Sequence, residues 1–397
     1  MSDGIYTAET GLTAFEAGLQ SISNDTSNMN TPGYKGSGVL FADLVGGNGE
    51  GGTGEGGDGV TTVGTAINFS AGQLQSTGNP LDLAISGNGF FTLRDANGNI
   101  HYTQDGQFEF NSAGILISSA TKEDVMALDS KTGTLVPISI NDAQSNPASP
   151  TTKVTFSGNL FTGTGATPTA QTVGNITVID KEGGSHTLSM TLTPVTGSTG
   201  VWTVTMTDPT TGDTIAAASP GTVTFVGGVP SPTADTVAMT YTLADGSSSQ
   251  FTLDFSSNVT SNSAGTSSTL AFASQDGFPV GSLTGESFDS TGTLVFSYSN
   301  NQTKNGPQLA LANFSSPNEV EAISSNEFAA KGQGWQVGVA GTGTFGTIQS
   351  GQIEGSNVDL SQEFSNLVIM QRGYQACSQV ISTASDMLSS LFDMVVK

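Results

Sequence analysis

The chain has 397 residues, of which 11% are charged, and 10 Lys and Arg stand against 34 Asp and Glu, for a net charge of −24. Without a basic surface to displace phosphate counterions, neither nucleic acid nor an anionic membrane surface is an expected partner. A single cysteine excludes an intramolecular disulfide. No apolar run reaches the ~18 residues needed to span a bilayer, so we expect no membrane insertion.

The first residues do not resemble an ordinary secretion signal. Residues 1–6 contain no basic segment, no apolar core and no small-residue cleavage site. The rest of the chain is rich in Gly, Ser and Thr and poor in charge, which is typical of extracellular proteins. Together these observations indicate a cytosolic protein, or export by a route that needs no cleaved signal peptide.

Apolar residues at alternating steps of three and four predict a helix from about Asp3 to Thr26. Pro32 and Gly33 end it, because proline disfavours helix at the residue before it and glycine permits a turn. Such a stripe is typical of a helix that packs against another helix, although it could instead cap the core of its own domain. The members of the N-terminal stripe are Ile5, Ala8, Leu12, Phe15, Leu19 and Ile22.

Glycine fills nine of the fourteen residues from Gly46 to Gly59, in a five-residue repeat with acidic residues. Calcium-binding β-helix repeats have a nine-residue period with an apolar residue in each turn, and this run has neither. We therefore expect a flexible acidic loop, within a Gly-rich connector that spans residues 31–70.

From Val60 onward, alternating apolar residues and turn dipeptides predict short β-strands. Asn97-Gly98 and Asp105-Gly106 predict hairpin turns, and Asp245-Gly246 precedes a further strand. The alternating sets are Leu81, Leu83 and Ile85; Ile176 and Val178; Leu188, Met190 and Leu192; Trp202, Val204 and Met206; and Phe251, Leu253 and Phe255.

Many short strands separated by turns indicate sandwiches or barrels rather than a parallel α/β sheet. The expected fold class is α+β, mainly β, with N- and C-terminal coiled-coil helices flanking discontinuous β-domains. We expect a terminal helical domain from residues 1–30 and 356–397 and an inner β-domain from 71–145 and 275–355. Residues 146–274, where Thr- and Ser-rich strands concentrate, would form an outer β-domain inserted into the inner one.

A second apolar stripe predicts a long C-terminal helix. Ser356 and Asp359 resemble a capping box, and helix from there to Val396 would cover roughly 60 Å. A helix that long cannot bury its stripe against one small β-domain and needs other helices from this chain and its neighbours. The members of the C-terminal stripe are Met370, Tyr374, Cys377, Ile381, Ala384, Leu388, Leu391 and Val395, and the Cys377 thiol is expected to act there as a small apolar group.

The sequence predicts no catalytic, cofactor or metal site. His101 and His186 lie neither near a cysteine nor in a metal-ligand spacing, and no Walker loop or nucleophile elbow occurs. Residues 341–346 fit GxGxxG by letter but lack a surrounding βαβ unit. Asp208, Asp254 and other carboxylates lie at turns or strand ends, where aspartate is common for backbone reasons.

Two terminal motifs resemble the signatures of the bacterial flagellar rod and hook protein family. Residues 23–35 form an Asn-rich run ending in Thr-Pro-Gly-Tyr-Lys, and residues 356–364 and 371–376 resemble the matching C-terminal signature. Residues 81–91 and 102–108 resemble the family's first β-domain. The positions that carry the terminal match are Asn28, Thr31, Pro32, Gly33, Tyr34, Lys35, Asn357, Asp359, Leu360, Gln371, Arg372 and Tyr374; Asp25 and Ser27 depart from the pattern.

Within that family, a chain of this length with an inserted β-domain resembles the hook subunit. The resemblance implies a non-enzymatic subunit that polymerises with itself into a curved helical tube between rod and filament. It also implies rod, hook-cap and hook-filament junction proteins as partners, and unfolded export through the flagellar type III apparatus to an extracellular position. The alternatives are a distal rod subunit and, in another class, a secreted carbohydrate-binding or hydrolytic β-protein.

Overall fold

The computed structural model describes residues 2–45, 57–163, 169–210, 214–217, 221–243, 246–316, 319–324, 326–332 and 334–395. The chain divides into two compact units. The first unit comprises residues 1–142, 286–296 and 304–397, and the second comprises residues 143–285 and 297–303. The predicted outer domain, residues 146–274, lies inside the second unit.

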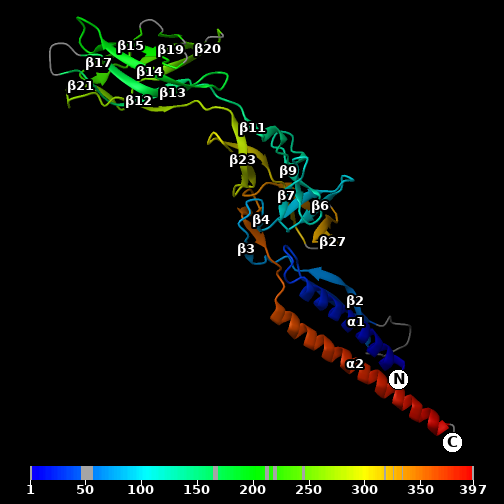
Figure 1. Cartoon of the computed structure of the whole chain (residues 1–397). Coiled ribbons are helices and arrows are strands. Elements are labelled where there is room, and N and C mark those ends of the chain that lie inside the picture. The colour runs from blue at the N-terminus through cyan, green and yellow to red at the C-terminus, as the bar shows by residue number, and fades with distance from the viewer. Residues whose placement is uncertain are drawn as a thin grey trace. The chain divides into compact units, whose positions relative to one another are not determined.

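Two helices belong to the first unit, α1 (Ser2–Ser27) and α2 (Leu360–Val395). Figure 1 shows them side by side, in blue and orange-red. α1 is one residue longer at each end than predicted. α2 begins later than the predicted capping box, because Asp359 is its N-cap: Asp359 Oδ1 accepts hydrogen bonds from the backbone N–H groups of Ser361 (2.8 Å) and Gln362 (3.2 Å). Ser356 Oγ instead accepts from the N–H of Val358 at 3.3 Å, so its predicted capping role is wrong.

The segment predicted as a Gly-rich connector contains a β-hairpin. Strands β1 (Ser37–Val45) and β2 (Gly57–Ile67) pair antiparallel, with register shifts at 40/41 and 43/45. Residues 46–56 of the expected acidic loop lie outside the described residues, whereas Gly57–Gly59 already belong to β2. Both strands pack along α1, so this stretch supports the helix as well as linking it to the β-structure.

The main sheet of the first unit has the strand order β27-β28-β6-β5-β9-β8-β7. Its core is aromatic: Phe90 packs edge-on against Phe69 and Phe314 at centroid distances of 5.4 and 5.3 Å. The strands are β5 (Phe90–Arg94), β6 (Ile100–Thr103), β7 (Phe108–Phe110), β8 (Leu116–Ser118), β9 (Asp124–Leu128), β27 (Val320–Ser324) and β28 (Glu327–Ala330), with β10 (Leu135–Pro137), β26 (Leu311–Phe314) and β29 (Trp335–Gly338) pairing beside them.

One predicted hairpin is present in this sheet and one is not. β5 and β6 pair antiparallel across Asn97-Gly98, as predicted, with Gly98 at φ +91°. β6 and β7 do not pair, so the predicted hairpin at Asp105-Gly106 is wrong. Gly106 instead lies against another strand, since its carbonyl accepts from the N–H of Leu83 at 2.9 Å and a Cβ at Gly106 would collide with the Leu83 carbonyl.

Smaller sheets are formed by strands outside the main sheet. β3 (Leu74–Ser76) pairs with β31 (Gln352–Glu354), and β4 (Leu83–Ser86) with β30 (Thr347–Ser350). A further sheet has the order β11-β23-β24-β25, formed by β11 (Ser145–Asn146), β23 (Gly281–Phe288), β24 (Thr293–Tyr298) and β25 (Thr303–Gln308); a 3₁₀ turn, Asn141–Ala143, precedes it.

The second unit is built from two sheets around one apolar core. Residues of alternating burial from both sheets, Trp202, Val204 and Met206 among them, form that core, so the predicted alternation is confirmed there. One sheet contains β12 (Lys153–Phe161), β16 (Thr214–Ala217), β19 (Thr236–Thr242), β20 (Ser248–Asp254), β21 (Val259–Asn262) and β22 (Ala271–Gln275); the other contains β13 (Gln171–Ile179), β14 (Ser185–Pro194), β15 (Val201–Thr207), β17 (Thr222–Val226) and β18 (Val229–Pro230). Asp245 lies outside the described residues.

Candidate functional site: the junction between the two chain termini

The N-terminal motif folds against residues from the other end of the chain. Gly33 adopts φ +67°, and a Cβ there would lie 2.5 Å from the backbone N of Asp105, so only glycine fits. The N–H of Gly33 donates to the Glu354 carbonyl at 2.8 Å. The Pro32 carbonyl accepts from Asn326 Nδ2 at 2.9 Å. The turn that ends the first helical segment is therefore clamped on both sides by the β-structure.

Tyr34 and Asp25 form the polar centre of this turn. The Tyr34 hydroxyl donates to Asp25 Oδ1 at 2.8 Å and accepts from Asn24 Nδ2 at 2.9 Å, while Asp25 Oδ2 accepts from the N–H of Ser37 at 3.0 Å. Burial raises the pKa of Asp25, opposed by these hydrogen bonds. Burial and the Asp25 hydrogen bond raise the pKa of Tyr34. The pair holds the end of α1 against the start of β1.

Lys35 makes a buried ion pair with Glu354. Its Nζ lies 2.7 Å from Glu354 Oε1, and the side chains are 1% and 3% exposed. Each partner makes a further hydrogen bond: Lys35 Nζ donates to the Ser70 carbonyl at 2.9 Å, and Glu354 Oε1 also accepts from the N–H of Gly72 at 2.6 Å. Such additional hydrogen bonds help to offset the desolvation of a buried pair.

Asn357 ties three segments together just before α2. Its Oδ1 accepts from the N–H of Gly36 at 2.9 Å, and its Nδ2 donates to the carbonyls of Asn68 and Ser70 at 2.7 and 2.9 Å. An aspartate could not make the two donations, because a carboxylate only accepts. The amide therefore acts as a three-way connector.

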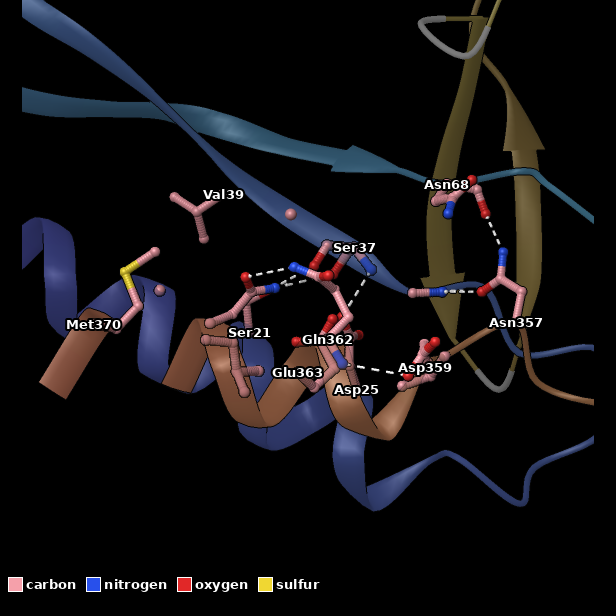
Figure 2. Close-up of a pocket in the computed structure, with 16 residues that line it drawn as sticks. Ser21, Asp25, Ser37, Val39, Asn68, Asn357, Asp359, Gln362, Glu363 and Met370 are labelled. Atoms are coloured by element: carbon pink, nitrogen blue, oxygen red, sulfur yellow. Dashed lines mark hydrogen bonds between the residues drawn. The ribbon is translucent and has the colours of Figure 1, made fainter. Parts of the chain in front are cut away.

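A groove of about 400 Å³ lies beside this junction, between α1, the start of β1 and the first turns of α2. Figure 2 shows Asp25 and Ser37 joined on one side of it, Asn357 bonded to Asn68 on the other, and Met370 at its far end. Glu363 also lines the groove, and burial together with the nearby Asp25 charge raises its pKa. The groove is polar near the junction and apolar toward the helices.

Beyond the junction, α1 and α2 pack closely through small residues. Built Cβ atoms would lie 2.8 Å from Cys377 Sγ at Gly11, 3.0 Å from Met370 Sδ at Gly18, and 2.4 Å from the Phe15 ring at Gly373. Gly373, which weakens helix, is thus explained by the Phe15 ring that lies over it. The two helices run antiparallel, because residues earlier in α1 contact residues later in α2.

The structure places the predicted stripe residues in three environments. Ala8, Ile22 and Ala384 are buried; Ile5, Leu12, Phe15, Leu19, Met370, Cys377, Ile381 and Leu388 are half-buried; Tyr374 and Leu391 are 40% and 44% exposed. The Val395 side chain lies outside the described residues. The fully buried face of α1 is Ala8, Gly11, Ala14, Gly18, Ile22 and Asp25, offset from the predicted stripe because the glycines allow the closest approach. The assembly role of the stripe stays a prediction.

Five apolar side chains of α2, one of them Leu391 of the predicted stripe, remain exposed although α1 packs alongside this helix. We call Ile369, Val380, Met387, Leu391 and Met394 the outer stripe; they are 62%, 49%, 53%, 44% and 73% exposed. Their spacings of eleven, seven, four and three residues keep them on one face at helical periodicity. α2 therefore has a wider apolar arc than α1 covers.

The remaining motif residues play local roles or none within one chain. Asn28 Oδ1 accepts from Thr31 Oγ1 at 3.1 Å, which supports the turn after α1. Leu360 is the first residue of α2, and Gln371 and Arg372 are exposed on it. Sequence reasoning missed Glu354, which lies in the short strand Gln352–Glu354 two residues before the C-terminal motif and carries no signal of its own. It treated Asp25 only as a departure from the family pattern.

His186 belongs to a hydrogen-bond network of the second unit. His186 Nε2 lies 2.8 Å from Asp180 Oδ2, and His186 Nδ1 lies 2.7 Å from the Tyr241 hydroxyl, which donates to Asp208. Burial raises the pKa of Asp180, but hydrogen bonds from His186 and Gly184 outweigh it and leave the pKa lowered. This network fastens strands of the second unit together. No helix in the described part of the chain is long and apolar enough to cross a membrane.

The matching family models and the most similar curated sequences point to one family. Residues 84–146 match the family described as flagellar hook protein FlgE/F/G D1 domain, and residues 349–394 match flagellar basal body rod FlgEFG protein C-terminal. The chain is 30% identical to the flagellar hook protein FlgE of Escherichia coli K12, over 98% of both chains. It is 29% identical to FlgE of Salmonella typhimurium LT2, again over 98% of both. A solved structure of Helicobacter pylori flagellar hook protein FlgE2 covers 69% of this chain and 99% of that one, at 12% identity and a TM-score of 0.39.

Proposed function

This chain belongs to the flagellar hook protein family and is a structural subunit of the hook, and on that premise we propose how it assembles. The α1–α2 pair is the polymerising element, and the outer stripe of α2 packs against terminal helices of neighbouring subunits. The polymer is a curved helical tube between rod and filament that bends while it transmits torque. Its other partners are the rod, hook-cap and hook-filament junction proteins. The subunit leaves the cell through the type III export apparatus without a cleaved signal peptide, and its final position is extracellular.

The exposure of the outer stripe carries this proposal. Ile369, Met387 and Met394 each leave more than half of a large apolar side chain in water, on the same helix face. Fully burying such a side chain contributes about 1.5 to 3 kcal/mol. Along the later turns of α2 the opposite face is polar, with Ser382, Asp386 and Ser389 exposed, whereas Phe364 and Val368 are exposed near its start. Around Met387, the apolar and polar faces are therefore distinct.

The test is Met387→Asp in the full-length chain. Because Met387 is 53% exposed, the subunit should fold unchanged, with the same circular dichroism and melting profile. In the polymer the carboxylate would be desolvated at every subunit, so the critical concentration for assembly should rise more than tenfold. Electron microscopy and sedimentation measure tube formation.

Ser389→Asp is the matched control, since it adds the same charge two residues away on the polar face. It should assemble nearly as the parent chain does. If both variants form tubes at the same concentration, the outer stripe is not an assembly surface. If purified protein forms no tubes under any condition but binds polysaccharide, the alternative of a secreted carbohydrate-active β-protein gains support.

A further inference from the structure

Three side chains that could bind a metal ion lie close together on one face of the main sheet of the first unit. They come from β6 (His101), from the residue before β9 (Glu123) and from the first residue of β28 (Glu327). The registers explain the meeting. Leu93 lies opposite both His101 and Val125, and Glu327 lies opposite Thr103. Residues paired across strands, or two apart along one strand, share a face, so all three side chains emerge on the same side.

Each of the three offers one ligand atom, and these atoms lie within 4.8 Å of one another. His101 Nδ1 lies 2.8 and 3.0 Å from the two oxygens of Glu123, and these side chains are 18% and 13% exposed. Glu327 is 5% exposed, and its buried Oε1 has no hydrogen-bond partner. A buried, unpartnered carboxylate oxygen near a second carboxylate is costly unless a cation neutralises the pair.

We propose that His101, Glu123 and Glu327 bind one divalent transition-metal ion of the Zn²⁺ type. An imidazole nitrogen with two carboxylate oxygens is a donor set that Zn²⁺, Co²⁺ and Mn²⁺ accept. Ligands at about 2.0–2.2 Å from a tetrahedral ion are about 3.4 Å apart, so small side-chain rotations would close the site. Three protein ligands leave a fourth position for water.

Glu327 Oε1, which has no hydrogen-bond partner, favours a metal site over a simple ion pair between His101 and Glu123. A protonated His101 beside Glu123 satisfies those two groups but leaves Glu327 Oε1 without a partner. The ion takes the place of the proton on the coordinating imidazole nitrogen, so binding releases protons to solvent. Glu327 also lines a groove of about 550 Å³, which gives an ion a path to the site.

Binding would fasten residues that are far apart in the sequence. His101 lies on β6 and Glu123 directly precedes β9, both in the middle of the sheet, whereas Glu327 begins β28, next to the terminal strand β27 of the strand order. An ion held by all three would lock this edge to the sheet. It would therefore stabilise the first unit and leave the second unit unaffected.

The experiment uses the full-length chain after chelator treatment, titrated with Zn²⁺ and with Co²⁺ in the presence of excess Mg²⁺. We expect one ion per chain, a visible Co²⁺ spectrum of low-coordinate type, proton release, and a rise in the first unit's melting temperature. Glu327→Gln and His101→Gln should each weaken Zn²⁺ affinity by at least tenfold while circular dichroism stays unchanged.

Glu109→Gln is the control, because Glu109 is a surface carboxylate of the same sheet paired with Lys122. It should bind as the parent chain does. Unchanged Zn²⁺ affinity in both Glu327→Gln and His101→Gln would overturn the assignment, as would the absence of stoichiometric binding in the parent chain. If either variant unfolds, Co²⁺ spectra of the parent chain still decide, because imidazole and carboxylate ligation has its own absorption.

Discussion

At the scale of single residues, the junction shows how burial and hydrogen bonding set the behaviour of ionisable groups. Asp105 follows the strand β6 and contacts the turn at Gly33, where its side chain is 7% exposed. Burial raises its pKa to about 6, opposed by a hydrogen bond from the N–H of Gln107 and reinforced by the charge of Asp82. The folded chain therefore holds this proton more tightly than the unfolded chain does.

Asp105 should make the stability of the first unit fall as pH rises. Between the ordinary aspartate pKa of about 3.9 and the folded value of about 6, the folded state binds more protons than the unfolded state does. The contribution of protonated Asp105 to the free energy of unfolding is therefore fully present below pH 4 and is lost as the pH rises through 6. The total is about 3 kcal/mol. Urea unfolding from pH 4 to pH 7 measures it. Asp105→Asn should remove Asp105's share of the slope and leave the smaller shares of Asp25 and Glu363, whose pKa values are also raised.

Asp95→Asn is the control for that series. Hydrogen bonds from Asn99 and Asn97 lower the pKa of Asp95 to about 2, although slight burial opposes them. Its contribution is present above pH 4 and is lost between pH 4 and pH 2. The Asp95 variant should keep the slope between pH 4 and 7; a flat profile there in the parent chain would contradict the assignment to Asp105.

Gly373→Ala should destabilise the helix pair in spite of better helix propensity. Alanine favours helix by about 1 kcal/mol, but its methyl would lie 2.4 Å from the Phe15 ring, and such overpacking costs about 1–3 kcal/mol. We expect a lower midpoint for the loss of helical circular dichroism. Gly4→Ala, which has nothing within 4 Å, should leave or raise that midpoint.

At the scale of elements, the Lys35–Glu354 pair joins the connector after α1 to β31. Lys35→Met should cost about 3–5 kcal/mol, because it leaves a buried carboxylate without its cation. Lys35→Met combined with Glu354→Met should recover much of that loss. A double-mutant cycle in urea measures the coupling, and strictly additive losses would show that the pair contributes nothing of its own.

The element scale also shows what a sequence can predict. Periodicity located both helices to within a few residues and the alternation of the Trp202 strand, because those signals are local. The dipeptide Asp105-Gly106 is typical of a hairpin turn, but in the structure the Gly106 carbonyl instead accepts a hydrogen bond from the distant Leu83. Likewise Lys35 belongs to a recognisable motif, whereas its partner Glu354 could be identified only in three dimensions.

The candidate metal cluster also could not be predicted from the sequence, because long-range contacts bring its residues together. His101, Glu123 and Glu327 have no motif spacing, and strand register alone brings them together. The α2 capping error was different, since Ser356 and Asp359 are both good caps and only the hydrogen bonds decide between them.

At the scale of the whole molecule, the two units should unfold independently. The apolar core of the second unit lies entirely within residues 154–270. A fragment of residues 143–285 should therefore fold as a monomer with the melting transition that the unit has in the full chain. The buried Trp202 reports on this unit, and Trp335 belongs to the other, so Trp335→Phe isolates the signal. An unfolded or aggregated fragment would contradict the division.

The separation of 319 residues between Lys35 and Glu354 affects the order in which parts of the chain fold. Closing an unstructured loop of that length costs about 5 kcal/mol in chain entropy, far more than a hairpin turn costs. The local hairpins of the β-units must form early and shorten the loop before the termini can meet. Until the last fifty residues are available, α1 has no helical partner from its own chain. The helix pair that we propose as the polymerising element is therefore completed last, so self-association should wait until the whole chain is present.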